Sequence, residues 1–233
     1  MLEITWLGHA TVQLRLESGE VLLLDPWTDG NPAYPKTHVI DRVDGILISH
    51  GHFDHIHDAV PLAKRFNPKV VAIFETAYWL ESKGVQNTSA MNKGGSQMLG
   101  PVKVTMVHAI HSCGIIDEEQ IIYGGEACGY VLRLPNNRCI YFAGDTNVFT
   151  GMELIRELYR PELAFLPIGD LFTMSPHEAS MAAKLLNVKK IIPMHFGTFP
   201  PLTGTPEQLA TLLKKDMPDT EVWTLEPGKP VLW

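Results

Sequence analysis

The sequence has no long apolar run and no cluster of basic residues. No apolar stretch reaches the roughly 18–20 residues that a transmembrane helix needs, so we expect no membrane span. The formal net charge of the 233-residue chain is −7, and lysine and arginine are adjacent only in pairs such as Lys64-Arg65 and Lys189-Lys190. Binding to nucleic acid through neutralised phosphates therefore has little support.

Cysteine is also scarce. The three cysteines, Cys113, Cys128 and Cys139, are an odd number and show no CxxC spacing, which argues against a disulfide framework. The opening residues MLEITWLGHA lack the basic and apolar segments of a signal peptide. We therefore expect reduced thiols and a cytoplasmic protein.

Strand and helix patterns cover most of the chain. The segments LEITWL and TVQLRL alternate apolar and polar residues, as half-buried strands do. Farther along, apolar strands such as LAFLPI and KKIIPMH alternate with helices, and SPHEASMAAKLL and TPEQLATLLKK begin with the signature of a capping box. No composition break marks a boundary. The sequence predicts one α/β (α+β) domain spanning residues 1–233, with sheets at its core and helices outside.

Four of the ten histidines lie in one short segment, SHGHFDHIHD, at residues 49–58. Its candidate metal ligands are His50, His52, Asp54 and His55. Imidazole and carboxylate groups suit zinc, manganese or iron. We interpret the segment as part of a metal site rather than a polar loop, because three further candidates each follow an apolar strand and strand ends converge at one edge of a sheet. These candidates are His111, Asp145 and His195.

In this order of residues the chain resembles the metallo-β-lactamase superfamily. The HxHxDH motif is HGHFDH at residues 50–55, and His111, Asp145 and His195 follow in the family's order. The segments LGHA, DPW, GDT and IPMHFGTFP resemble small metal-dependent hydrolases related to the ascorbate-phosphate lactonases, with N-acylphosphatidylethanolamine phospholipase D as a more distant relative. The resemblance covers nearly the whole chain. It implies a four-layer αβ/βα sandwich with the metal site at the sheet edge.

The resemblance also implies a ligand set for two divalent metal ions. Zinc is the first expectation, and manganese and iron are alternatives. One ion would be held by His50, His52 and His111. The other would be held by Asp54, His55 and His195, and Asp145 would bridge the two.

The implied reaction is hydrolysis by a metal-bridged hydroxide of a small anionic ester, lactone or phosphodiester. The implied catalytic residues are Asp54 and Asp145, as acceptors of a proton, and His195, mainly as a ligand. True β-lactamases of the superfamily typically place a cysteine where Asp145 stands, which argues against antibiotic hydrolysis. The partner is thus a small-molecule substrate.

His9 and Asp25 are candidates for a supporting role or for contact with substrate. Asp25 ends an apolar strand, and a buried carboxylate needs partners and can orient a metal ligand. His108 precedes His111 by three residues, and we expect it to point into the packing of its strand. The sequence leaves open whether the pocket is also lined by His38, His177 and Cys113.

Three other functions compete with hydrolysis of a small ester. A dimetal redox protein of this fold usually has a flavin domain and an extra carboxylate in the histidine cluster, and neither is visible. A nucleic-acid-processing hydrolase usually carries a large inserted domain. A binding module without activity is disfavoured by the complete ligand set. The sequence does not decide the natural substrate, the physiological metal or whether the chain forms a homo-oligomer.

Overall fold

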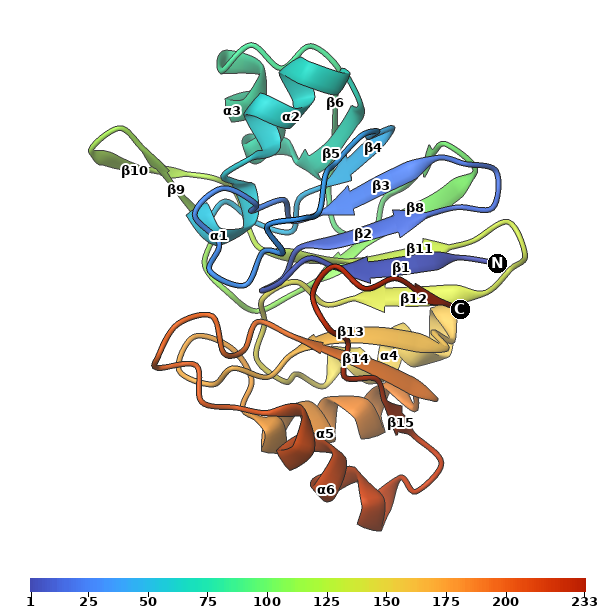
Figure 1. Cartoon of the computed structure of the whole chain (residues 1–233). Helices are drawn as coiled ribbons and strands as arrows, with labels where there is room; N and C mark the ends of the chain where they lie inside the picture. Colours follow the sequence, from blue (N-terminus) through green and yellow to red (C-terminus); the bar gives the residue numbers. More distant parts are fainter. The chain divides into compact units, whose positions relative to one another are not determined.

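The computed structural model describes residues 1–233, which group into two compact units. Unit 1 comprises Met1–Asn92, Ser112–Ala127 and Leu225–Trp233, and unit 2 comprises Lys93–His111 and Cys128–Thr224. Each unit is built on a seven-stranded mixed sheet with helices (Figure 1). That residues 1–233 form a single hydrolase domain stays a prediction.

The sheet of unit 1 combines an antiparallel part with a parallel part. Its strands are β1 (Glu3–Trp6), β2 (Val12–Arg15), β3 (Val21–Leu24), β4 (Gly45–Leu47), β5 (Lys69–Ile73), β6 (Thr88–Met91) and β16 (Val231–Leu232). The order is β16-β1-β2-β3-β4-β5-β6. Pairing is antiparallel from β16 to β3 and parallel from β3 to β6. Strands β1, β3 and β4 therefore run in one direction, and their carboxyl ends share one edge.

Three helices belong to unit 1: α1 (Phe53–Ile56), α2 (Ala59–Phe66) and α3 (Phe74–Ser82). Helix α2 buries Ala59, Leu62 and Ala63, whose spacing places them on one face. They join a core cluster with strand residues such as Ile46 and Val70. All four residues of β3 are buried, as its continuous apolar run predicts.

A two-stranded hairpin is formed by residues 114–123 of unit 1. Strands β9 (Gly114–Asp117) and β10 (Gln120–Tyr123) pair antiparallel, and the hairpin extends away from the sheet (Figure 1). A lone hairpin is marginally stable in water. Here Asp117 anchors it, because its carboxylate accepts hydrogen bonds from Trp79 Nε1 at 2.9 Å and Lys83 Nζ at 2.6 Å. Such anchoring leaves no local sequence signal.

The sheet of unit 2 also combines an antiparallel part with a parallel part. Its strands are β7 (Ser96–Leu99), β8 (Val102–His108), β11 (Cys128–Arg133), β12 (Cys139–Phe142), β13 (Leu163–Pro167), β14 (Lys190–Met194) and β15 (Glu221–Val222). The order is β15-β14-β13-β12-β11-β8-β7, with parallel pairing from β12 to β15 and antiparallel pairing elsewhere. Strands β8, β12, β13 and β14 run in one direction.

Helices α4 (Gly151–Tyr159), α5 (Pro176–Leu186) and α6 (Pro206–Asp216) complete unit 2. The predicted capping boxes are confirmed at both later helices: Ser175 pairs with Glu178, and Thr205 pairs with Gln208. The buried faces of the three helices enter one core cluster with the sheet. None of the helices in the chain is long and apolar enough to cross a bilayer.

The structure corrects one prediction about a side chain and gives another side chain a role outside its helix. Asp58 directly precedes α2, but its carboxylate does not bond to that helix. It instead accepts hydrogen bonds from the backbone N–H of Thr28 at 2.6 Å and Asp29 at 2.9 Å, which holds the loop after β3. His108 was expected inside the packing of its strand, yet it is exposed as the last residue of β8. There its ring packs edge-on against Phe149, at 5.3 Å between centroids.

The capping box of α5 gives a test of local stability. We expect Ser175→Ala to lower the free energy of unfolding by about 1 kcal/mol, because the N–H of Glu178 loses its acceptor. Thr150 is a matched control, since it occupies the N-cap of α4 without a side-chain cap bond. Thr150→Ala should change stability by less than about 0.5 kcal/mol. Urea unfolding followed by circular dichroism measures both, and equal effects would contradict this account of the cap.

Candidate metal centre

Strand direction in unit 1 brings several polar residues to one edge of its sheet. His9 follows β1, Asp25 follows β3, and the segment from Ser49 onward follows β4. These three strands run in one direction, so all three loops leave from the same edge. The short helix α1 then carries Asp54 and His55. This arrangement fulfils the expectation that strand ends collect the polar candidates of unit 1.

Asp25 is the centre of a buried hydrogen-bond network. Its Oδ1 accepts the backbone N–H of Ser49 at 2.7 Å. Its Oδ2 accepts the Ser49 hydroxyl at 2.6 Å and His55 Nδ1 at 2.7 Å. Burial raises the pKa of Asp25, while His55 and Ser49 oppose that shift by favouring the charged carboxylate. A fully buried carboxylate is thus supplied with partners on both oxygens.

This network fixes the tautomers of two histidines. A carboxylate only accepts hydrogen bonds, so His55 donates through Nδ1 and keeps its lone pair on Nε2. The Ser49 hydroxyl donates to Asp25, so its oxygen accepts from His50 Nδ1 at 2.9 Å. His50 therefore also keeps its lone pair on Nε2. A carboxylate behind the imidazole is the usual way in which proteins orient histidine ligands.

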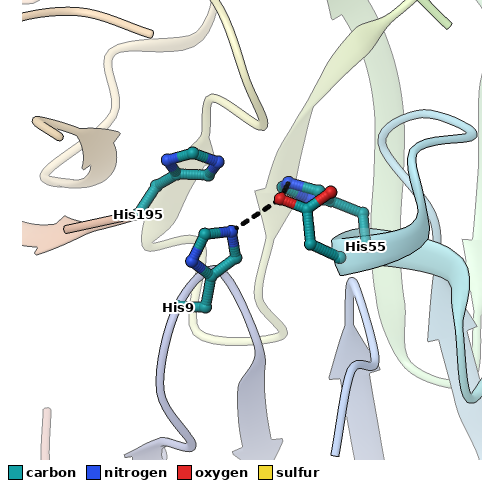
Figure 2. A group of neighbouring side chains, drawn as sticks. His9, His55 and His195 are labelled. Carbon is teal, nitrogen blue, oxygen red and sulfur yellow. Dashed lines mark hydrogen bonds and ion pairs between the residues drawn. The ribbon is translucent and has the colours of Figure 1, made fainter. Parts of the chain in front are cut away.

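His9 contacts a second carboxylate of the cluster. Its Nε2 lies 2.9 Å from Asp54 Oδ2 (Figure 2). The ring is fully buried and packs edge-on against Trp27, at 5.2 Å between centroids. The same Asp54 oxygen lies 3.7 Å from His55 Nε2. His9 thus fixes the orientation of Asp54 toward His55.

The turn between His50 and His52 is tightly packed. His50 Nε2 lies 3.0 Å from His52 Nδ1, so both rings present a nitrogen to the same place. A Cβ on Gly51 would lie 2.3 Å from Ile115 Cγ1, which explains the glycine by close approach. Cys113 Sγ accepts the N–H of Gly51 at 3.3 Å. Cys113 therefore supports the backbone of this turn.

In unit 2, strand direction also brings polar residues to one edge of the sheet. His111 follows β8, Asp145 follows β12 and His195 follows β14, and these strands run in one direction. Asp145 Oδ2 lies 3.0 Å from His195 Nε2 and 3.7 Å from His111 Nε2. One carboxylate oxygen thus faces an imidazole nitrogen from each of two other loops. The structure brings together the three predicted residues of this unit.

Two residues outside the predicted set hold these loops in place. The hydroxyl of Thr146 accepts the N–H of Ile110 at 3.0 Å and donates to the carbonyl of Asn147 at 2.8 Å. The loop carrying Asp145 is thereby tied to the residue before His111. On the other side, a Cβ on Gly169 would lie 2.1 Å from the carbonyl oxygen of His195. Only glycine allows the loop after β13 to approach His195 this closely.

Three site residues have an unusual backbone conformation. His9 has φ 55°, Asp25 φ 46° and His195 φ 54°. Residues other than glycine rarely adopt this left-handed region, and single cases cost about 1–3 kcal/mol. Asp25 and His195 directly follow β3 and β14, and His9 lies three residues after β1. The surrounding packing therefore holds these side chains in positions that local preference would not select.

The remaining histidines lie outside both clusters. His38 Nε2 is 3.4 Å from Gln13 Oε1, and burial lowers the pKa of its imidazole. His57 is half-exposed beside Asp58. His177 is exposed at the start of α5 and lines a separate cavity with Asp170 and Glu207. None of them contacts the predicted ligands of its own unit.

The donor atoms suit divalent transition metals. Imidazole nitrogens with oriented lone pairs, together with carboxylate oxygens, are the ligands that zinc, manganese and iron accept. In unit 1 the ligand atoms of Asp25, His50 and His55 all lie within 4.8 Å of one another. Because Asp25 is fully occupied by hydrogen bonds, its role is to orient His50 and His55 rather than to bind an ion itself.

Comparison with known proteins decides the family. Residues 21–196 match the family model described as the Beta-lactamase superfamily domain. A UPF0173 metal-dependent hydrolase of Solibacter usitatus is 71% identical over 100% of both chains. The chain belongs to the metallo-β-lactamase superfamily. Within it, the chain is a member of the UPF0173 metal-dependent hydrolases, so the predicted enzyme class is confirmed.

Solved structures confirm the fold class. Igni18, a metallo hydrolase from the archaeon Ignicoccus hospitalis, has a TM-score of 0.86 at 31% identity and covers 99% of this chain and 97% of its own. CmlA, a diiron β-hydroxylase from Streptomyces venezuelae, has a TM-score of 0.77 at 15% identity, covering 99% of this chain and 54% of its own, which is a likeness of fold alone. The predicted α+β fold of the metallo-β-lactamase type is thus confirmed, whereas the lactonase branch stays a prediction.

Ser49 is the supporting residue that the sequence did not reveal. A serine before the HxHxDH motif carries no signal of its own, and its role depends on Asp25, 24 residues earlier. Thr146 was visible within the GDT segment, but no role could be read from it. A polar residue that follows an apolar strand and adjoins a ligand motif would have been the only usable indication.

Ser49→Ala tests the orienting network. We expect about 10–100-fold weaker metal binding or activity, because His50 loses its acceptor and Asp25 loses one donor. The matched control is Ser180→Ala, which removes another buried serine hydroxyl, one that bonds to the carbonyl of His177. Titration with zinc against a competing chelator measures the affinity. Equal affinities for both variants would refute the role given to Ser49.

Proposed function

We propose that this protein is a two-metal hydrolase that acts on a small anionic ester, lactone or phosphodiester. The observation that carries the proposal is the buried Asp25 network, which directs Nε2 of both His50 and His55 away from their supporting partners. A structural role alone would not need two imidazoles held as neutral acceptors. The established enzyme class and the second carboxylate–imidazole cluster in unit 2 support the same reading.

The proposed ligands divide into two sets that share one carboxylate. The first ion would be held by His50, His52 and His111. The second would be held by Asp54, His55 and His195. Asp145 would be shared by both sets, a role supported by its Oδ2, which faces both His111 and His195. Zinc is the proposed metal, with manganese and iron as alternatives.

Two bound divalent ions would supply an acidified water near neutral pH and polarise the oxygen of the attacked centre. The chain's own residues hold the metal ligands in position and offset part of the metal charge. Asp25 and Ser49 hold His50 and His55 in one tautomer, and His9 holds Asp54 in one orientation. Asp54 and Asp145 would be the groups that accept a proton, and no protein nucleophile would be needed.

Charge indicates the class of substrate. Asp54 and Asp145 are the carboxylates proposed to face the ions, and they offset only part of the charge of two divalent cations. The centre therefore keeps an excess of positive charge although the chain as a whole carries −7. An excess of positive charge favours an anionic substrate. The three cysteines are free and buried, which supports action in a reducing compartment such as the cytoplasm.

Metal analysis tests the two-ion proposal. Protein purified without chelator should contain about two transition-metal ions per chain, and a chelator should abolish hydrolysis until metal is restored. The assay is a panel of lactones, phosphodiesters and carboxylic esters with elemental analysis of the same sample. Cys113→Ala should keep its activity, because Cys113 only supports the Gly51 backbone. One ion per chain at saturating metal would refute the dinuclear site.

Asp145→Asn tests the proposed bridge. The change keeps the side-chain shape but removes the charge that offsets repulsion between two cations, and an amide nitrogen cannot ligate. We expect loss of at least one ion and of most activity, with an unchanged circular dichroism spectrum. Asp25→Asn should be milder, about 10–100-fold, because it acts through His50 and His55. If Asp145→Asn keeps two tightly bound ions and near-normal turnover, Asp145 does not bridge them.

A further inference from the structure

The hairpin of unit 1 has an open strand edge. Its sheet contains only β9 and β10, so β10 has a neighbouring strand on one side and none on the other. Strands β15 and β16, which each form an edge of a large sheet, have only two residues, and short edge strands hinder pairing with other chains. Strand β10 has four residues, Gln-Ile-Ile-Tyr, with neither a charge nor a proline. It therefore lacks these common protections of an edge.

The register of the hairpin shows which backbone groups face this edge. The N–H of Gly124 donates to the carbonyl of Cys113 at 3.1 Å, so these two residues form a hydrogen-bonded pair. Hydrogen-bonded and non-hydrogen-bonded pairs alternate along antiparallel strands. The pairs that Ile121 and Tyr123 form with β9 are therefore non-hydrogen-bonded ones. The N–H and C=O groups of both residues thus point away from β9, toward the open edge.

The side chains at this edge are apolar and lie in solvent. Ile121 and Tyr123 are 79% and 74% exposed, and they share one face of the hairpin because they are two residues apart. The opposite face is attached to the rest of unit 1, since Ile115 is buried there and Asp117 bonds to α3. The hairpin extends away from the sheet of its unit (Figure 1). Its edge is therefore accessible to another strand.

We propose that β10 pairs antiparallel with β10 of a second copy of this chain, about a two-fold axis at Ile122, to form a homodimer. In this register, Ile121 of each copy faces Tyr123 of the other, and each such pair exchanges two backbone hydrogen bonds. A β-branched side chain opposite an aromatic one is a favourable pair across strands. The strand is thus complementary to itself in both its backbone and its side chains.

The charges of the turn select the antiparallel direction. Glu118 and Glu119 connect β9 to β10, and both are exposed. A parallel arrangement would place the carboxylates of the two turns side by side, and like charges on adjacent strands are destabilising. The two-fold arrangement places the two turns at opposite ends of the combined four-stranded sheet. Antiparallel pairing therefore avoids this repulsion.

The size of the contact sets its strength. Pairing of two four-residue strands buries less surface than the roughly 1,200–2,000 Å² of stable complexes. We therefore expect a weak, reversible dimer with a Kd of about 1–100 µM. The contact includes none of the proposed metal ligands. The dimer should form before and after treatment with a chelator, so its test does not depend on the proposed hydrolysis.

Sedimentation velocity of the full chain at about 1–300 µM tests for the dimer. Ile121→Lys should weaken dimerisation at least about ten-fold, because lysine on an edge strand opposes pairing. The matched control is Ile116→Lys. Ile116 is also exposed and lies on the same face, directly opposite Ile121, but on β9 and thus one strand away from the second copy. Its Kd should stay within about two-fold of the unmodified chain.

Ile122→Cys tests the register directly. At the two-fold axis the two copies of Ile122 form a non-hydrogen-bonded pair, whose Cα atoms are about 4.5 Å apart. This separation lies within the roughly 4.4–6.8 Å of disulfides, so mild oxidation should give a covalent dimer on a denaturing gel. Ile116→Cys is the control and should not cross-link, because β9 forms the outer strand of the combined sheet. The three native cysteines are buried, so the unmodified chain provides the baseline.

A chain that stays monomeric up to about 300 µM would overturn the proposal, as would a dimer that Ile121→Lys leaves intact. Equal loss of the dimer with Ile116→Lys would show that the hairpins pack face to face, which contradicts pairing through the edge. Equal cross-linking of Ile116→Cys and Ile122→Cys would contradict the register. If Ile121→Lys does not fold by circular dichroism, Ile121→Pro replaces it with the same expectation, because it removes an N–H that β9 does not use.

Discussion

A buried carboxylate with hydrogen bonds on both oxygens sets the chemistry of unit 1. Asp25 lies where no water reaches it, so its negative charge persists only because Ser49 and His55 bond to it. The same bonds impose one tautomer on His55 and, through Ser49, on His50. The hydrogen bonds that stabilise the buried charge of Asp25 are therefore the same ones that orient the imidazoles of His50 and His55. Removing any member leaves either an uncompensated charge or a ring that is free to turn.

The two sheets show how strand direction creates a site from distant residues. In unit 1 the loops after β1, β3 and β4 share an edge, and in unit 2 the loops after β8, β12 and β14 do so. Sheet geometry thus gathers residues that are up to 84 positions apart, such as His111 and His195. The apolar strands contribute precision because their buried, hydrogen-bonded ends cannot shift independently.

Much of the fold and of the candidate site could be predicted because the sequence patterns that indicate them are local. The HxHxDH cluster, the apolar strand before each candidate and the capping boxes at Ser175 and Thr205 are readable within a few residues. The β9–β10 hairpin was not, because its support comes from Trp79 and Lys83, more than 30 residues away. The inward prediction for His108 was wrong because this residue ends β8: it follows the buried Met106 in the strand's alternation, yet at the end of the strand it is exposed. Contacts between distant segments decided each case that the sequence missed.

The left-handed backbone at His9, Asp25 and His195 creates a conflict between stability and function. Glycine adopts this conformation at little cost, so glycine at these positions would relieve the backbone strain. The same change would remove the contact of His9 to Asp54 or that of His195 to Asp145. These three positions are therefore where the molecule trades resistance to unfolding for the placement of reactive groups. A stabilised version of this enzyme should be engineered elsewhere in the chain.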